Sequence, residues 1–186
     1  MNTTMRFRVR DYAGVRTQFM WDEEVASIER ALLLQMEKLS TGTTMVIDFN
    51  GIAMASDAAR RLLKRAILRI QGGEWSDRAI VLEKLGSGLY NVKVMLLSER
   101  LAVVIRTEND GPTLLGEIEP AVLETYRFVV RRKSATARDV QKAFALNTVA
   151  AATNRLARLA KVGAVRRIGQ EAVEGGGLQY RYAAVQ

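Results

Sequence analysis

The pattern of apolar residues changes near Gly116, and this change most constrains how the chain can fold. Before it, short β-branched runs alternate with amphipathic stretches, as in "TMVIDFNGIAM" (44–54) followed by residues 56–71. Such alternation predicts a mixed sheet with helices packed on it. After it, closely spaced helical patterns end in a basic hairpin. We therefore predict two domains, residues 1–117 and residues 118–186.

The predicted order of the first domain is β-β-α-β-α-β-α-β. "RFRVRDY" (6–12) and "VRTQFMW" (15–21) predict a hairpin, because apolar and polar residues alternate on both sides of a glycine turn. Helices are expected at 22–39, capped by Asp22, and at 56–71, capped by Ser56. Strands are expected at 78–85 and 102–106, with a helix at 91–101 between them and a loop at 107–112. The apolar stripes of the first two helices are Val25, Ile28, Leu32, Met36 and Leu39, and Ala59, Leu62, Leu63, Ala66, Ile67 and Ile70.

Composition narrows the functional classes. The chain has no Cys and no His, which excludes disulfides and thiolate metal sites and removes the commonest general base and metal ligand. Asp48 ends a predicted strand, and no second acid stands at a suggestive spacing from it. We therefore expect no catalytic residues, no metal, no cofactor and no enzymatic activity. No apolar run approaches the roughly 20 residues of a membrane span, so we expect a cytoplasmic protein without membrane contact.

The positive charge is concentrated in the second domain. Residues 1–117 carry 16 Lys and Arg against 15 Asp and Glu, whereas residues 118–186 carry 12 against 5. This asymmetry favours a polyanion as partner of the second domain. Its predicted elements are helices at 119–133, 134–144 and 148–162 and a hairpin made of "AVRRI" and "LQYRYAAV".

The helix at 148–162 separates into two faces. Its buried stripe is expected to be Val149, Ala152, Leu156, Leu159 and Val162. Its outward face is expected to be Asn147, Ala150, Ala151, Asn154, Arg158 and Lys161. Small side chains on that face allow a close approach to another surface, and Asn, Arg and Lys can bond to bases and phosphates. The same face also fits a solvated helix in a bundle, where alanine is simply a good helix former.

The segment "ATARDVQKAFALNTVAAATNRLARLAKVGAVRRI" (135–168) resembles the winged helix-turn-helix domains of bacterial transcription regulators. The resemblance covers roughly residues 119–186 and implies a recognition helix in the major groove and a wing against the backbone or in the minor groove. It lacks the glycine often found in the turn and has "FALN" there. The candidate DNA-contacting residues are Thr136, Arg138, Asn147, Thr148, Ala151, Asn154, Arg155, Arg158 and Lys161, with Arg166, Arg167 and Arg181 on the wing side.

"MVIDFNGIAMASDAARRLL" (45–63) and "NVKVMLLSERLAVVI" (91–105) are similar to the STAS fold of anti-sigma factor antagonists. That resemblance spans about residues 5–117 and implies a phosphorylatable serine where a buried strand leads into a helix. Here Ala58 occupies the acceptor position, and Ser56 and Asp57 form a candidate regulatory loop. The helix at 56–71 offers a partner surface or a solvated face, through Arg60, Arg61, Lys64, Arg65 and Arg69.

Together these patterns predict a transcription regulator. A STAS-like α/β domain would mediate dimerisation or bind a protein partner, and a winged helix would bind double-stranded DNA. The alternative is a partner-switching adaptor, whose first domain binds an ATPase or anti-sigma-type protein and whose second domain is another protein-binding module.

Overall fold

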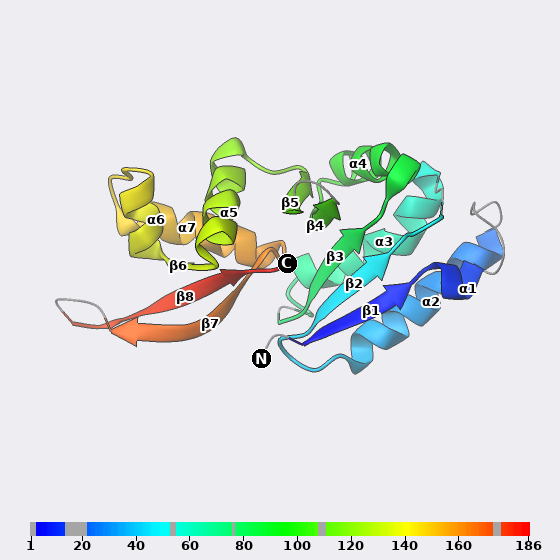
Figure 1. The fold of residues 1–186 in the computed structure, drawn as a ribbon, viewed down its shortest axis with the longest axis horizontal. Helices are drawn as coiled ribbons and strands as arrows, with labels where there is room; N and C mark the ends of the chain where they lie inside the picture. Colours follow the sequence, from blue (N-terminus) through cyan, green and yellow to red (C-terminus); the bar gives the residue numbers. More distant parts are fainter. Residues whose placement is uncertain (1–2, 14–21, 53–54, 76, 108–110, 173–175) are drawn as a thin grey trace.

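A computed structural model of the chain describes residues 3–13, 22–52, 55–75, 77–107, 111–172 and 176–186. These residues form a mixed α/β structure with two sheets, one of five strands and one of three (Figure 1). None of the described helices is both long and apolar enough to cross a membrane. We call residues 1–117 the front part and residues 118–186 the tail.

The front part is built on a five-stranded sheet. Its strands are β1 (Thr4–Arg8), β2 (Thr44–Asp48), β3 (Ala79–Glu83), β4 (Ala102–Thr107) and β5 (Gly111–Gly116), and they lie in that order. The first four are parallel, and β5 is antiparallel to β4. All residues of β2 and β3 are buried, as expected of central strands with both faces covered.

Helices cover one face of this sheet. They are α1 (Arg10–Ala13), α2 (Asp22–Lys38), α3 (Ser56–Gln71) and α4 (Leu89–Ser98), with a short 3-10 turn, η1 (Gly86–Gly88), before α4. The stripes predicted on α2 and α3 are buried and pack against Met45, Ile47, Ile80, Leu82 and Val103 of the strands. The predicted helices at 22–39 and 56–71 are confirmed, although the N-cap residue of α3 is Ala55 rather than Ser56.

The start of the sheet differs from the prediction. β1 ends at Arg8, residues 10–13 are helical, and β1 pairs in parallel with β2. The predicted second hairpin strand, residues 15–21, lies outside the described residues. Phe7 and Tyr12 stack with ring centroids 4.7 Å apart. The apolar residues that suggested one long strand therefore pack on each other across a turn.

Sequence patterns also missed β5, which begins inside the predicted loop. Gly116, at its end, has φ +118, and a Cβ there would lie 2.1 Å from the carbonyl oxygen of Leu101. Only glycine permits this close antiparallel return against β4.

The tail contains α5 (Pro120–Arg132), β6 (Ser134–Thr136), α6 (Ala137–Ala143), α7 (Val149–Lys161), β7 (Val165–Ala172) and β8 (Leu178–Ala184). The three helices and the hairpin follow the prediction, whereas the three-residue β6 was not predicted. β6 pairs with β8, so the sheet order is β6-β8-β7 and all its pairings are antiparallel. The predicted boundary falls between β5 and α5.

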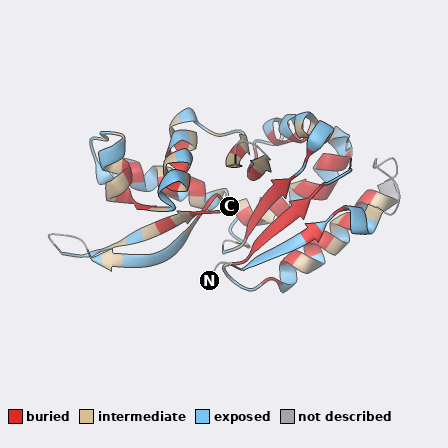
Figure 2. Ribbon diagram, viewed as in Figure 1, coloured by how far each residue is buried: buried red, intermediate tan, exposed pale blue. Residues whose placement is uncertain are grey.

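The tail packs on the second face of the front sheet. Val46, Val81 and Val104 stand side by side in register on that face. They share one buried cluster with Tyr126 of α5 and Leu156 of α7. Figure 2 shows the buried residues on both sides of the junction. Because each part covers apolar surface of the other, the two parts are held together by a common core.

Candidate nucleic-acid interface

The helix α7 is fixed by one cap and one apolar stripe. The Thr148 hydroxyl accepts a hydrogen bond of 3.2 Å from the Ala151 N–H, which satisfies a free donor at the helix start. Ala152, Leu156 and Leu159 are fully buried. Val149 was predicted to belong to this stripe but is 39% exposed, and Val162 is only half-buried. The stripe is shorter than predicted at both ends, because the core covers only the middle turns of α7.

The opposite face of α7 is open to solvent. The exposed residues on this face, together with the two that precede the helix, include Asn147, Thr148, Ala150, Ala151, Asn154, Ala157, Arg158 and Lys161. The structure therefore brings together on one surface most of the contact residues predicted on this helix. Arg155 departs from this set: it is half-buried, and its guanidinium lies 5.5 Å from the ring centroid of Phe144 at the end of α6.

An acidic side chain lies at one end of this exposed face. Arg158 Nη1 is 2.6 Å from Glu119 Oε2, and both side chains are more than half exposed. Glu119 is the N-cap residue of α5. Exposed ion pairs of this kind are weak, so Arg158 can exchange its partner for a phosphate.

Thr136 is not available for a DNA contact. It is 1% exposed and forms a capping box with Asp139, in which each side chain bonds to the other's backbone N–H. Burial alone would raise the pKa of Asp139, but the Thr136 N–H and hydroxyl, with Arg132 and Arg181, lower it below its usual value. The predicted contact role of Thr136 is replaced by a structural role at the start of α6. Arg138, next to it, is half-buried.

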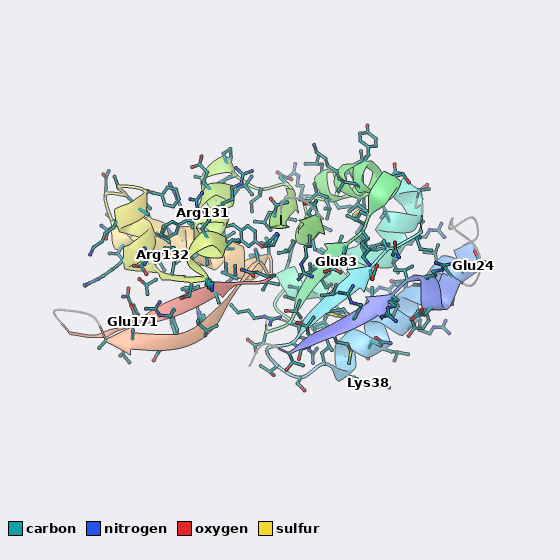
Figure 3. The ribbon with its side chains drawn as sticks, in the orientation of Figure 1. Glu24, Lys38, Glu83, Arg131, Arg132 and Glu171 are labelled. Atoms are coloured by element: carbon teal, nitrogen blue, oxygen red, sulfur yellow. The ribbon has the colours of Figure 1, made fainter. Side chains whose placement is uncertain are left out.

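The hairpin arginines lie on different sides. Arg167 stacks 4.2 Å from the ring centroid of Tyr180, and it lines a groove with Ala157 and Lys161 of α7. Arg167 therefore shares a surface with the exposed helix. Arg181 faces the opposite side of the sheet, where it contacts Glu171 of β7 and the Ser134 hydroxyl, at 3.2 Å from the latter (Figure 3 labels Glu171).

Arg166 points into the front part. Its guanidinium donates hydrogen bonds to the backbone carbonyls of Gly42 and Thr43, just before β2. Burial lowers the pKa of Arg166. We therefore remove Arg166 from the predicted phosphate contacts. Sequence patterns could not indicate the Arg166 contact, because its two acceptors are backbone atoms more than a hundred residues away.

Comparison of the chain with protein-family models, curated proteins and solved structures finds no match. The functional assignment therefore depends on the sequence patterns and on the geometry of the described residues.

The predicted regulatory loop lies at the N-terminus of α3. Ser56 is the first helical residue, and Asp57 is exposed in the first turn. An acid in this position is favourable for any helix, because the helix start carries a partial positive charge.

Sequence patterns missed a pair of buried acids in the front sheet. Asp48 was expected to have no second acid near it, but Glu83 stands beside it in register on β3, and both are 5% exposed. Arg6 Nη1 bonds to Asp48 at 2.9 Å and to Glu83 at 2.6 Å. Burial would raise the pKa of Asp48, but the Asn50 N–H, Arg6 and Lys84 lower it. Parallel pairing, rather than sequence spacing, brings these acids together.

Proposed function

We propose that the tail is a winged helix-turn-helix domain that binds double-stranded DNA, and that the chain is a transcription regulator. The order of elements supports this proposal: helix α5, strand β6, helices α6 and α7, then the hairpin β7-β8. The pairing order β6-β8-β7 places the hairpin next to the short first strand. The resemblance in the sequence implies the three helices and the hairpin, but not β6; in this proposal α7 is the recognition helix and β7-β8 is the wing.

The observation that carries the proposal is the exposed face of α7. Asn154 offers the donor and acceptor pair that matches an adenine edge, and Arg158 and Lys161 offer charges to guanine or phosphate. Ala150 and Ala151, beside them, leave the helix backbone close to whatever surface it meets. An α-helix fits the major groove of B-DNA, which is about 12 Å wide.

In this proposal, backbone contacts come from cations of the tail that line a groove between α7, β7 and the front part. Lys161 and Arg167 both line it, at the C-terminal end of α7 and on β7. Charges there would fix the position of the helix along the duplex, while the residues nearer Asn154 distinguish bases.

We further propose that the STAS-like front part pairs two copies or binds a protein partner. A symmetric dimer would present two α7 helices, and its operator would be an inverted repeat with half-sites about one helical turn apart. The candidate regulatory loop, Ser56 and Asp57, would then lie in the part that receives the signal.

Selection of bound duplexes from a random pool by the full chain tests the proposal. We expect one enriched motif. In Asn154→Ala, the free energy that discriminates the preferred base from the others should fall by roughly 1–3 kcal/mol at one base pair of each half-site. Thr153→Ala is the matched control, since Thr153 is also exposed on α7 but its hydroxyl donates to the Val149 carbonyl at 3.0 Å. A full chain that binds every duplex equally would contradict the proposal.

One observation favours the partner-switching adaptor as a second candidate. A surface pocket of about 470 Å³ between α2 and α3 is lined by Leu68, 44% exposed, and by four cations. Arg60 and Lys64 pair with Glu99, and Arg65 pairs with Glu29. An acidic partner with an apolar residue would fit this surface. Recovery of one stoichiometric protein after nuclease treatment, lost in Leu68→Asp, would favour the adaptor.

A further inference from the structure

A second pocket lies where the parallel strands β1, β2 and β3 end. It has a volume of about 420 Å³ and is lined by Arg6, Arg8, Arg10, Asp11, Asp48, Asn50, Glu83 and Lys84. Ligands of open α/β sheets commonly bind at the carboxyl ends of the strands. The tail covers the apolar residues of the same sheet face, such as Val46 and Val81, but not this polar end.

A row of charged residues crosses four strands at the pocket, and all of them except Arg106 line it. Arg8, Asp48, Glu83 and Arg106 stand next to one another in register on β1 to β4. Arg6 bridges the two acids, and Arg106 bonds to Glu83 (Figure 3 labels Glu83). The buried carboxylates are therefore neutralised by protein groups, and the pocket does not require a cation to balance them.

Two of the cations that line the pocket have no acidic partner among the described residues. Among the described residues, Arg8 and Arg10 form no ion pair, and both are exposed. The Arg10 guanidinium lies over the β2–α3 loop, where Nη1 is 3.9 Å from the position a Cβ on Gly51 would take. Lys84 adds an ammonium 3.4 Å from Asp48. Four cations and three carboxylates line the pocket, and Arg106, paired with Glu83 beside it, adds a fifth cation. The group as a whole has a net charge of +2, which favours a dianion as ligand.

The lining also indicates what the rest of the ligand is. Every lining residue is charged or an amide, and no aromatic or aliphatic side chain is among them. Such a pocket disfavours a nucleobase or an apolar group, because these bind against aromatic or aliphatic side chains. Carboxylate and amide oxygens instead accept hydrogen bonds from hydroxyl groups.

We propose that this pocket binds a small phosphorylated polyol, of the sugar phosphate class. Arg8 and Arg10 hold the phosphate, because guanidinium groups bind its oxygens in pairs and remain charged at all working pH values. Asp48, Asn50 and Glu83 accept hydrogen bonds from the hydroxyl groups. This site lies in the front part, and its existence does not depend on DNA binding by the tail.

Calorimetric titration of the full chain tests the site. We expect saturable binding of glucose 6-phosphate, weaker binding of inorganic phosphate, and no binding of glucose. The double variant Arg8→Gln/Arg10→Gln should bind glucose 6-phosphate at least about tenfold more weakly, since it loses two charge-assisted contacts. The control is Arg30→Gln/Lys38→Gln, which removes the same charge from exposed positions on α2 and should bind normally.

A variant that gains affinity for the ligand distinguishes an effect on binding from an effect on folding. Asp11→Asn removes the exposed carboxylate of the pocket and should strengthen binding of glucose 6-phosphate about twofold, a result that misfolding cannot produce. Absence of saturable binding for both glucose 6-phosphate and glycerol 3-phosphate would overturn the proposal. An equal loss in the Arg30/Lys38 control, or equal affinities for inorganic phosphate and glucose 6-phosphate, would overturn it as well.

Discussion

Arg158 of α7 forms an ion pair with Glu119 at the N-cap of α5, with 2.6 Å between Nη1 and Oε2. The pair links the proposed DNA-reading helix to the N-cap residue of the helix that packs against the front sheet. It also places a negative charge beside the surface that, in our proposal, meets a polyanion. Glu119 is therefore an internal competitor for the phosphate or guanine that Arg158 would bind.

Removing that carboxylate should strengthen DNA binding. We expect Glu119→Gln to bind the selected duplex about three- to tenfold more tightly at low salt, because Arg158 is released and a repulsive charge is lost. Titration at several salt concentrations would measure the effect. Glu124→Gln, an exposed acid on α5, is the control and should change affinity less. An unchanged Glu119→Gln affinity would place Arg158 outside the interface.

Lys161 and Arg166 should behave differently although both are basic residues of the tail. Lys161 is exposed on α7, and Lys161→Ala should reduce the salt slope of DNA binding by about one. Arg166 bonds to the Gly42 and Thr43 carbonyls, so Arg166→Ala should keep the slope and lower the free energy of unfolding by about 1–3 kcal/mol. Salt titrations and urea denaturation of both variants distinguish these roles. A reduced slope in Arg166→Ala would return this residue to the contact set.

Gly163 should contribute to stability at the junction between the two parts. Its φ is +70, and a Cβ there would lie 3.0 Å from Cγ2 of Ile70 on α3. Gly163→Ala should lower the free energy of unfolding by about 1–3 kcal/mol, through backbone strain and the close contact. Gly169→Ala is the control, because an added Cβ there meets nothing within 4 Å. Equal effects of the two substitutions in urea denaturation would argue against a tight junction.

The tail should lose stability in acid through Asp139. Its pKa is lowered in the folded state, so the unfolded chain takes up a proton first as the pH falls. The stabilisation is complete well above the unfolded value of about 3.9 and is lost as the pH falls through the lower folded pKa. Asp139→Asn should therefore be less stable than the parent at pH 6, with the difference shrinking toward pH 3. Urea denaturation across this range checks the prediction, and Asp57→Asn, in the first turn of α3, serves as control.

The capping box shows how far local sequence determined the tail. A threonine followed three residues later by an acid is a local signal for the start of a helix. Thr136 and Asp139 form this pattern, and α6 begins directly after Thr136. The outward face of α7 followed in the same way from helical spacing, since Asn154, Arg158 and Lys161 recur at three- and four-residue steps. Local sequence could not show that Thr136 is buried, because its burial depends on how the helices and strands pack.

The sequence by itself determined the elements with strong local signals: α2, α3, α7, the central strands and the basic charge of the tail. Tertiary structure alone decided which residues from distant elements meet. Asp48 meets Glu83 through strand pairing, and Arg166 reaches Gly42 through packing of the tail on the sheet. Arg181 points away from Arg167 because Arg167 of β7 pairs with Tyr182, and Tyr182 and Arg181 alternate in direction along β8. Periodicity reports the direction of a side chain from its own element. It carries no information about which partner lies opposite, because that depends on contacts between residues far apart in the chain.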